Sequence, residues 1–478
     1  MNIYFLGIGG IGMSALARYF HQTGHTVGGY DRTESALTRQ LVEEGIDVHY
    51  DDDPTRIPAN LDLVIYTPAV PQDTLEFQHL AQSGIPMKKR SMVLGELTEG
   101  KKCIAVAGSH GKTTTSAMIA YLLSKSDVGC SAFLGGIAKN FDSNMLIDAK
   151  SEYIVVEADE YDRSFLQLHP YYSVITATDP DHLDIYGTHE HMVEAFSQFA
   201  NQLQPGGHLF VKEGLMGEGH HHDHEHSHEH DEHDHDEHDE SHHTPHLVVK
   251  DDIDCKTYSA RSIEPDYYAI NVRNYNGNIY FDLRTPQGVF YDIELQESSL
   301  YNVENAVAAS AVALSVGLTE YQLRHGLKTF KGIRRRFDFR IKEKELVYID
   351  DYAHHPREIS ATIESIRYLY PHKRVVGIFQ PHLYSRTADL ATEFAQALSQ
   401  LDEIILMPIY PAREKPIAGV SSHLILKQIS SMNKYYCMPN QVGDLVVALC
   451  PDVVVTMGAG DIDRLVPKLE KQLREESL

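Results

Sequence analysis

The sequence predicts an α/β protein with three domains in series, and three observations support this prediction. Apolar strand-like runs alternate with stretches of helical spacing along most of the chain, a pattern typical of parallel sheets covered by helices. Two glycine-rich turns each follow such a run and open a helix. Finally, a chain of 478 residues has room for about two to four domains of roughly 100–200 residues each.

The alternation divides into three blocks. The first runs from a strand and glycine turn to a polar junction at 99–102, the second opens on an apolar strand at 103–107, and the third begins near Thr329. Strand patterns in the third block lie at 345–349, 375–379, 403–407 and 453–457, with a helical stretch over 387–398. The predicted domain bounds are 1–100, 101–328 and 329–478.

Composition and charge exclude several classes of protein. The formal net charge is -26, with 42 basic and 68 acidic side chains, which argues against nucleic-acid binding because a phosphate backbone requires a basic face. The longest apolar stretch, near 306–318, is too short to span a bilayer, so we expect no membrane insertion. Five cysteines without a C-x-x-C pair, and a start without the features of a signal peptide, favour a reduced, cytoplasmic protein.

A low-complexity insert occupies 219–246 in the second block. Between His220 and His246 the chain has 13 of its 29 histidines and 10 acids, but no Lys or Arg. Because the run has no apolar side chain that could build a core, we expect it to be disordered by itself. Two interpretations stay open: a solvated acidic tether, or a set of weak, exchanging sites for Zn²⁺ or Ni²⁺, since imidazole suits these metals.

The first glycine loop has the pattern G-x-G-x-x-G. Gly7, Gly9 and Gly12 stand between a strand and a helix, and Asp31 follows the next strand. This arrangement brings a pyrophosphate close to the backbone at a helix N-terminus and offers an acid to a ribose. The pattern alone leaves three possibilities: a dinucleotide, another nucleotide diphosphate, or a tight turn without a ligand.

The second glycine loop predicts a phosphate site more sharply. Gly108 to Thr115 follows an apolar strand, and its Gly-Lys-Thr-Thr segment opens a helix. In such a loop backbone N–H groups hold the phosphates, Lys112 reaches the terminal phosphates, and the Thr113 hydroxyl can bind Mg²⁺. Val106 stands where the strict pattern has glycine.

Acidic and histidine side chains follow the next two strands of the second block. Glu157 and Asp159 end one strand, and Asp181, His182 and Asp184 follow the next. The carboxyl ends of parallel strands meet at one edge of the sheet, beside the phosphate loop. We therefore expect this edge to hold Mg²⁺.

The third block contains three clusters of polar and charged residues next to predicted strands. One is the basic run 332–338, one is 350–356, and one is 379–387. A single cluster of this kind is usually a packing or capping loop. Three in succession at the ligand-binding edge of an open sheet predict a substrate-facing surface.

These motifs, in this order, resemble the Mur ligase family over nearly the whole chain. The segments that carry the resemblance are 7–14, 108–115, 157–162, 181–186, 302–305, 332–339, 350–356, 379–387 and 410–421. The resemblance implies a Rossmann-like UDP-binding domain, a central domain of the P-loop ATPase type with a mostly parallel sheet, and a Rossmann-like C-terminal domain. It also implies that the first glycine loop binds UDP-N-acetylmuramate rather than a redox cofactor.

The segments 7–14, 351–356 and 410–417 are similar to those of members that add L-alanine. The implied activity is therefore ATP-dependent joining of L-alanine to the carboxylate of UDP-N-acetylmuramate through an acyl phosphate, in peptidoglycan precursor synthesis. Cell-wall biogenesis, cell shape, cell cycle and cell division are the implied processes. The implied partners are small molecules, ATP with one or two Mg²⁺ ions, and no nucleic acid; the enzyme would be a monomer or homodimer.

The resemblance also implies roles for individual residues. The implied catalytic residues are Lys112, His182, Arg335, His354 and Arg386. The implied ATP-binding residues are Gly108, Ser109, His110, Gly111, Lys112, Thr113, Thr114, Asn302, Asn305, Arg336 and Asp351. Those implied for the UDP-sugar are Gly9, Gly10, Ile11, Gly12, Asp31 and Thr67, and those for metal are Thr113, Glu157 and His182.

Some positions depart from the family pattern, and two alternatives stay open. Tyr4 and Tyr301 stand where many relatives have His, and Leu383 stands where many have Arg. There is no Lys between Lys150 and Lys212, whereas the ligases that add later residues use a carbamylated Lys there. The alternatives are a ligase that recycles murein tripeptide and, in another class, a nucleotide-gated metal-binding protein.

The insert yields a direct test. Zinc calorimetry on the full chain and on a variant lacking 219–246 should show extra zinc bound only by the full chain, with affinity falling below roughly pH 6 as imidazoles protonate. The deletion should keep the basal activity, because the insert is remote in sequence from the phosphate loop. Equal zinc stoichiometry in the two proteins would eliminate the metal interpretation.

Overall fold

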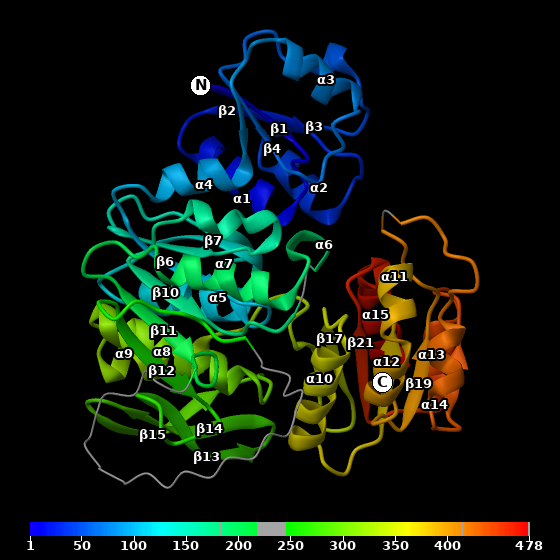
Figure 1. Ribbon diagram of the computed structural model, residues 1–478. Helices are drawn as coiled ribbons and strands as arrows, with labels where there is room; N and C mark the ends of the chain where they lie inside the picture. Colours follow the sequence, from blue (N-terminus) through cyan, green and yellow to red (C-terminus); the bar gives the residue numbers. More distant parts are fainter. Residues whose placement is uncertain (181–182, 218–244, 413, 477–478) are drawn as a thin grey trace, which may run out of the picture. The chain divides into compact units, whose positions relative to one another are not determined.

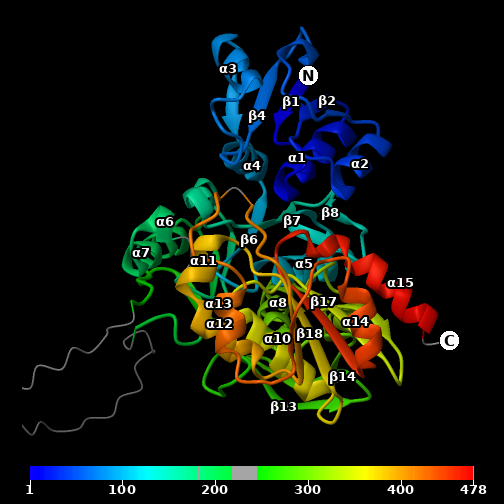
Figure 2. The same ribbon diagram turned by 90° about the vertical axis from the view of Figure 1, so that its right-hand side faces the viewer.

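The protein is described from a computed structural model, which defines residues 1–180, 183–217, 245–412 and 414–476. Its strands form three sheets, and the chain divides into two compact units. The first unit comprises Met1–Gly135, Asn144–Tyr268 and Val307–Leu318, and the second comprises Gly136–Ser143, Ala269–Ala306 and Thr319–Leu478. The α/β architecture predicted from the sequence is confirmed (Figures 1 and 2).

The first unit begins with a five-stranded parallel sheet in the order β3-β2-β1-β4-β5. This order reverses direction at β1, so a ligand-binding crevice is expected where β1 and β4 diverge at their carboxyl ends. The elements are β1 (Asn2–Leu6), α1 (Ile11–Gln22), β2 (Thr26–Tyr30), α2 (Ala36–Glu43), β3 (Asp47–His49), η1 (Pro54–Arg56), β4 (Leu63–Tyr66), α3 (Leu75–Gln82), β5 (Met87–Lys89) and α4 (Arg90–Thr98).

A second run of strands in this unit has the order β12-β11-β10-β6-β9-β7-β8, parallel from β12 through β7. Strand β6 lies in the middle, so the loop after it opens at the centre of the sheet edge. The elements are β6 (Lys102–Ala107), α5 (Lys112–Ser124), β7 (Ser131–Ala138), β8 (Ser143–Leu146), β9 (Tyr153–Glu157), η2 (Tyr161–Gln167), β10 (Tyr172–Ile175), α6 (Leu183–Tyr186), α7 (His189–Ala200), β11 (His208–Lys212) and β12 (Asp254–Ser259).

In the second unit β14 and β15 form an antiparallel hairpin, and a six-stranded sheet has the order β16-β17-β21-β18-β19-β20. Only β16 runs antiparallel in that sheet. The elements that follow along the chain through β18 are β13 (Tyr267–Tyr275), β14 (Asn278–Thr285), β15 (Gly288–Leu295), α8 (Asn302–Val316, which enters the first unit at Val307), α9 (Glu320–Thr329), β16 (Asp338–Lys342), β17 (Val347–Asp351), α10 (Pro356–Leu369) and β18 (Val375–Phe379). The remainder are α11 (Tyr384–Asp389), α12 (Ala391–Leu398), β19 (Glu403–Leu406), α13 (His423–Gln428), β20 (Lys434–Tyr436), α14 (Val442–Leu449), β21 (Val453–Met457), η3 (Asp461–Arg464) and α15 (Val466–Glu476).

The structure differs from the expected elements in a few places. The helix expected over 387–398 starts earlier and is interrupted at Leu390, which separates α11 from α12. Leu247, just after the insert, forms an isolated bridge with Met216. No helix of the described residues is long and apolar enough to cross a membrane.

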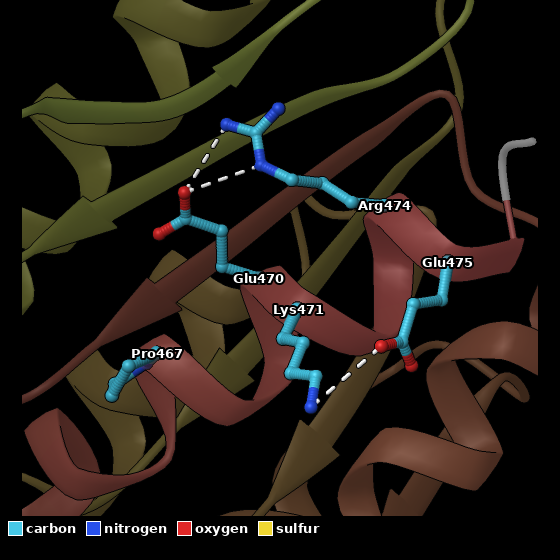
Figure 3. Close-up of a pocket in the computed structure, with 5 residues that line it drawn as sticks. All are labelled: Pro467, Glu470, Lys471, Arg474 and Glu475. Atoms are coloured by element: carbon cyan, nitrogen blue, oxygen red, sulfur yellow. Dashed lines mark hydrogen bonds and ion pairs between the residues drawn. The ribbon is translucent and has the colours of Figure 1, made fainter.

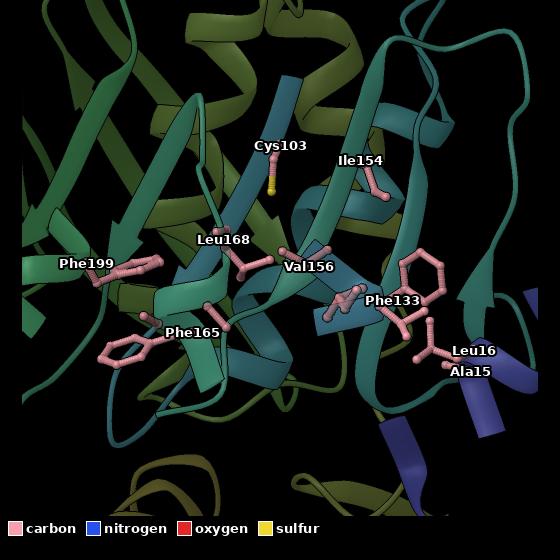
Figure 4. Close-up of a cluster of buried hydrophobic side chains, with 14 of the residues drawn as sticks. Ala15, Leu16, Cys103, Phe133, Ile154, Val156, Phe165, Leu168 and Phe199 are labelled. Carbon is pink, nitrogen blue, oxygen red and sulfur yellow. The ribbon is translucent and has the colours of Figure 1, made fainter. Parts of the chain in front are cut away.

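One apolar core joins the two sheets of the first unit. Side chains from β6, β9 and η2 pack with those of α7, and Phe165 stacks on Phe199 with ring centres 5.0 Å apart. Figure 4 shows Leu16 of α1 beside Phe133 of β7, and Tyr19 of α1 contacts the Phe133 ring at 5.5 Å. Because α1 carries the first glycine loop, this core holds that loop in a defined place within the unit.

A buried polar cluster lies on the other face of the first sheet. Tyr4, where the family commonly has His, donates its hydroxyl to Glu76 Oε2 at 2.6 Å and lies 2.7 Å from His49 Nε2. All three side chains are almost inaccessible to solvent. When the Glu76 carboxyl is protonated it can itself donate to Tyr4 Oη, which frees the tyrosine proton for His49. Tyr4 therefore fills a structural role in this chain.

Burial is the main cause of the shifts in this cluster. It raises the pKa of Glu76 to about 7 and lowers the pKa of His49. The folded chain then binds more protons at Glu76 than the unfolded chain does between the ordinary pKa of 4.5 and about 7. The stability that the neutral carboxyl contributes is therefore complete at acidic pH and is lost as the pH rises through about 7.

Glu76→Gln tests this titration. The neutral amide removes the pH-dependent term, so the variant should gain stability relative to wild type between pH 5 and pH 8 by about 1–3 kcal/mol. Denaturant unfolding at several pH values measures the difference, with the exposed pair residue Glu34, changed to Gln, as the matched control. A difference that stays constant across this range would contradict a raised pKa at Glu76.

Candidate active site

The phosphate loop predicted from the sequence lies at the turn from β6 into α5. Gly108 has φ +136° and Gly111, the residue before α5, has φ +83°. A Cβ on Gly108 would lie 2.2 Å from Thr176 Oγ1 and 2.7 Å from Ala177 N, so only glycine fits against the end of β10. The first N–H groups of a helix lack partners within the helix, so the start of α5 at this sheet edge is suited to bind an anion.

Side chains around the loop fix its shape. Ser109 donates its hydroxyl to Asp179 O at 2.6 Å, and Thr176 donates to the carbonyl of His110. His110 Nε2 lies 3.9 Å from Asp179 Oδ2. Thr113 and Thr114 are buried at the start of α5. The loop is therefore tied to the strand beside it.

Lys112 folds back over its own loop. Its ammonium donates to Gly108 O at 2.5 Å and to Glu160 Oε1 at 2.8 Å. Burial alone would lower the pKa of Lys112, but the charges of Glu160 and Glu157 outweigh that effect and raise it. A full positive charge therefore lies beside the loop that would receive phosphates.

The predicted metal-binding oxygens lie at the same sheet edge. Glu157 ends β9, the neighbour of β6, and accepts a hydrogen bond from Gly135 N at 3.0 Å. Its carboxylate lies where a Cβ on Gly135 would be, at 2.3 Å. The described residues contain no group of three or more His, Cys, Asp or Glu placed to hold a metal. Mg²⁺ at phosphates commonly takes only one or two protein ligands, so the oxygens of Thr113 and Glu157 suit it. His182 lies outside the described residues.

The predicted UDP-sugar residues come together at the first glycine loop. Gly9 N donates to Asp31 Oδ2 at 2.9 Å, and Gly7 has φ +84° with Thr67 packed against it. Gly10 and Ile11 begin α1. Asp31 therefore occupies a backbone N–H of the loop in this structure.

Sequence reasoning missed Arg90, which also lies at the first loop. A Cβ on Gly12 would lie 2.6 Å from Arg90 Nη1, so glycine is needed for the guanidinium to lie there. Arg90 Nη2 pairs with Asp159 at 3.1 Å, and the preceding Lys89 pairs with Asp162 at 3.0 Å. The basic run before α4 was the available signal. The segment after Glu157 thus connects to the first glycine loop through ion pairs.

The second unit brings together the basic run and the loop after β17. Arg335, in a left-handed conformation with φ +63°, donates to Gly458 O at 2.6 Å and lies 3.4 Å from Asp350. The guanidinium groups of Arg335 and Arg336 lie 5.1 and 4.9 Å from the Tyr352 ring. Tyr352 was not predicted, although it stands within the 350–356 motif.

Asp351 connects four segments of the second unit. Its carboxylate accepts from Tyr301 Oη, Phe337 N and Thr362 Oγ1, each at 3.1 Å, and from Ala353 N at 2.9 Å. Burial raises its pKa, against the effect of Arg336. Asn305 donates to Asn302 Oδ1 at 2.8 Å one helical turn into α8. Asp351 therefore orders the loops around the predicted nucleotide contacts.

His354 lies beside a histidine that the sequence analysis did not assign. The His354 and His382 rings are 6.2 Å apart, and His382 lies on the Tyr410 ring at 5.7 Å. Burial lowers the pKa of His354 and lowers that of His382 to about 4. Nδ1 of His382 is buried without a hydrogen-bond partner among the described residues. Both imidazoles are therefore neutral at physiological pH, and Arg386 of α11 adds a positive charge nearby.

Glu414 joins the 410–417 segment to the start of α11. It accepts from Tyr384 N at 2.5 Å and Ser385 N at 3.1 Å, and from the Ser385 hydroxyl. Burial alone would raise the pKa of Glu414, but these hydrogen bonds outweigh that effect and lower it. Leu383, the residue before α11, has φ +72°. This conformation costs about 1–3 kcal/mol for a non-glycine residue. Glu414 therefore stabilises a strained turn that carries His382 and Arg386.

A cavity of about 330 Å³ along α15 contains none of the predicted residues (Figure 3). Its charged side chains pair among themselves, as Arg474 with Glu470 at 3.1 Å and Lys471 with Glu475 at 3.7 Å. Glu470 also pairs with Arg340 at 2.7 Å and Arg474 with Glu343 at 3.3 Å, so these charges are used in ion pairs along the surface.

Three family models match the chain. The model described as "Mur ligase family, catalytic domain" matches residues 2–102, "Mur ligase middle domain" matches 106–228, and "Mur ligase, glutamate ligase domain" matches 335–460. The three matches follow one another along the chain in this order.

Similar proteins cover almost all of the chain. A UDP-N-acetylmuramate–L-alanine ligase of Phocaeicola vulgatus is 46% identical over 98% of this chain and 97% of its own length. One of Porphyromonas gingivalis is 45% identical over 99% of both. The crystal structure of the UDP-N-acetylmuramate-alanine ligase MurC of Thermotoga maritima has a TM-score of 0.81 with 24% identity, over 99% of both chains, which shows the same fold.

Glu414→Ala tests the role of this carboxylate. The substitution removes the acceptor of the Tyr384 and Ser385 N–H groups. Amide hydrogen exchange at these two residues should therefore accelerate by about 10-fold or more. Amides in β18 should keep their protection. Glu343→Ala, which removes an exposed partner of Arg474, is the matched control. Unchanged exchange at Tyr384 and Ser385 would count against this role.

Proposed function

The chain belongs to the Mur ligase family, and on that premise we propose that it joins L-alanine to the carboxylate of UDP-N-acetylmuramate with ATP. The reaction yields UDP-N-acetylmuramoyl-L-alanine, ADP and phosphate, and it serves peptidoglycan precursor synthesis. The observation that carries the proposal is full-length identity of 45–46% to relatives that bear this activity in their names. The murein tripeptide alternative has no comparable support from these relatives.

The chemistry requires activation of a poor electrophile. A carboxylate oxygen of the sugar nucleotide attacks the γ-phosphorus of ATP, the bond to the bridging oxygen breaks, and ADP leaves. The amine of alanine then attacks the acyl carbon, and phosphate leaves with the former carboxylate oxygen. Both reactants are anions, so the protein must neutralise charge and hold them in line.

The first unit supplies the phosphate-binding groups. Lys112 and the N–H groups at the start of α5 would bind the β- and γ-phosphates. Thr113 and Glu157 would hold Mg²⁺, which offsets phosphate charge when bound. The sugar nucleotide would place its pyrophosphate at Gly9 to Gly12, displacing Asp31 from Gly9 N.

The second unit supplies groups suited to the amino acid and to nucleotide phosphates. Arg335 and Arg336 are the cations proposed for the transferring phosphoryl group. His354 is neutral because burial lowers its pKa, so it can take a proton from the ammonium of alanine. Arg386 would bind the alanine carboxylate. Asn302 and Asn305 are proposed as adenine-side contacts.

The setting of the reaction is also a proposal. We expect the enzyme to work in the cytoplasm, where ATP and nucleotide-activated sugars are available, as a monomer or homodimer. The insert at 219–246 lies mostly outside the described residues, and a role for it in Zn²⁺ or Ni²⁺ binding stays a prediction.

A coupled ligation assay tests the proposal. Phosphate release should require ATP, UDP-N-acetylmuramate and L-alanine together, and Lys112→Ala should lower kcat by about 10²–10³ because a preorganised charge at the phosphoryl group is lost. Lys344→Ala, at an exposed residue, should match wild type. Near wild-type turnover in Lys112→Ala would show that the phosphate-loop assignment is wrong.

A further inference from the structure

Glu160 is a buried acid that the proposed mechanism does not use. It stands three residues after Glu157, directly before η2, with its side chain 2% exposed. Burying a carboxylate is costly unless a cation pairs with it. The partner here is Lys112 Nζ at 2.8 Å, so the acid is held against the phosphate loop itself.

Two hydrogen bonds hold the backbone at Glu160 in place. Its carbonyl oxygen accepts from Tyr186 Oη at 2.6 Å and from Arg163 N at 3.0 Å. Asp162 and Arg163 follow in left-handed conformations with φ +54° and +53°, which fixes the sharp turn after Glu160. Lys112 is a flexible chain with three donors. When a phosphate replaces Glu160 as the partner, we therefore expect the Lys112 ammonium to move rather than the carboxylate.

The neighbouring acids have partners of their own. Glu157 accepts from Gly135 N, Asp159 pairs with Arg90 and Asp162 pairs with Lys89. Glu160 forms an ion pair with Lys112 of the phosphate loop. An incoming phosphate chain would compete with Glu160 for the ammonium and would be repelled by the carboxylate.

We propose that Glu160 is a positioning residue for Lys112, holding its ammonium folded over the phosphate loop until the β- and γ-phosphate oxygens of ATP replace the carboxylate. This rests on the proposed function of the loop as the ATP site. The free energy needed to separate Lys112 from Glu160 reduces the affinity for the terminal phosphates. The benefit is that the lysine charge is already at the loop when phosphates arrive, so turnover depends on Glu160 although binding is weakened by it.

Glu160→Gln separates these two effects. The amide is nearly isosteric and still accepts a hydrogen bond, but it neither competes as a charge nor repels phosphate. Calorimetry should show ATP and ADP binding ~3–10-fold more tightly than to wild type, with AMP unchanged, because a charge-assisted contact is replaced by a neutral one. A merely structural residue would change all three affinities together.

Kinetics provide the second readout. In Glu160→Gln the KM for ATP should fall while kcat falls by about 10-fold, since the lysine is less well placed; Glu160→Asp should recover part of kcat. In Lys112→Met the additional Glu160→Gln change should tighten ATP binding less than it does when Lys112 is present, because only the direct repulsion of phosphate is then removed. Glu152→Gln, at an exposed pair with Lys102, is the control for loss of a carboxylate.

Two results would overturn the inference while leaving the ligase assignment intact. One is ATP and AMP affinities that change equally, or not at all, in a Glu160→Gln protein with normal thermal unfolding. The other is an equal effect of Glu160→Gln with and without Lys112. If Glu160→Gln does not fold, Glu160→Asp is measured in its place: weakened coupling to Lys112 with tighter ATP binding supports the inference, and unchanged ATP binding overturns it. Failure of wild type to ligate would instead contradict the proposed function.

Discussion

The turn between β6 and α5 is the constraint on which the rest of the site depends. Gly108 packs against the end of β10 so closely that no side chain fits, and Gly111 completes the reversal into the helix. That geometry turns the helix N-terminus outward and brings Lys112 over the loop. The neighbouring strand β9 must then end in acids, because a buried ammonium needs a counter-charge.

The segment from Glu157 to Asp162 supplies this counter-charge and also forms ion pairs beside the first glycine loop. Glu160 pairs with the lysine of the second glycine loop, while Asp159 and Asp162 pair with Arg90 and Lys89 beside the first. A six-residue stretch therefore relates the two predicted nucleotide sites inside one compact unit. In the second unit Asp351 has the corresponding role, since it gathers donors from four segments around the predicted cationic side chains.

The sequence allowed prediction of the parts of this structure that follow from local chemistry. The strands at 375–379 and 453–457 have the predicted bounds because they are apolar runs bounded by turns. β12 and β15 were not predicted, since their polar and apolar residues give no such run. Arg90, His382 and Glu414 were missed because their importance arises from contacts distant in sequence, such as Glu414 with Tyr384. The predicted roles of individual site residues remain predictions.

An oxygen-isotope experiment tests the central claim most directly. UDP-N-acetylmuramate labelled with ¹⁸O in its carboxylate is converted with ATP and L-alanine by the wild-type chain, and the products are analysed by mass. If the carboxylate attacks the γ-phosphorus, the released phosphate contains one ¹⁸O atom and the nucleotide product is unlabelled ADP. Phosphate without label, or label found in AMP, would contradict an acyl phosphate formed at this phosphate loop.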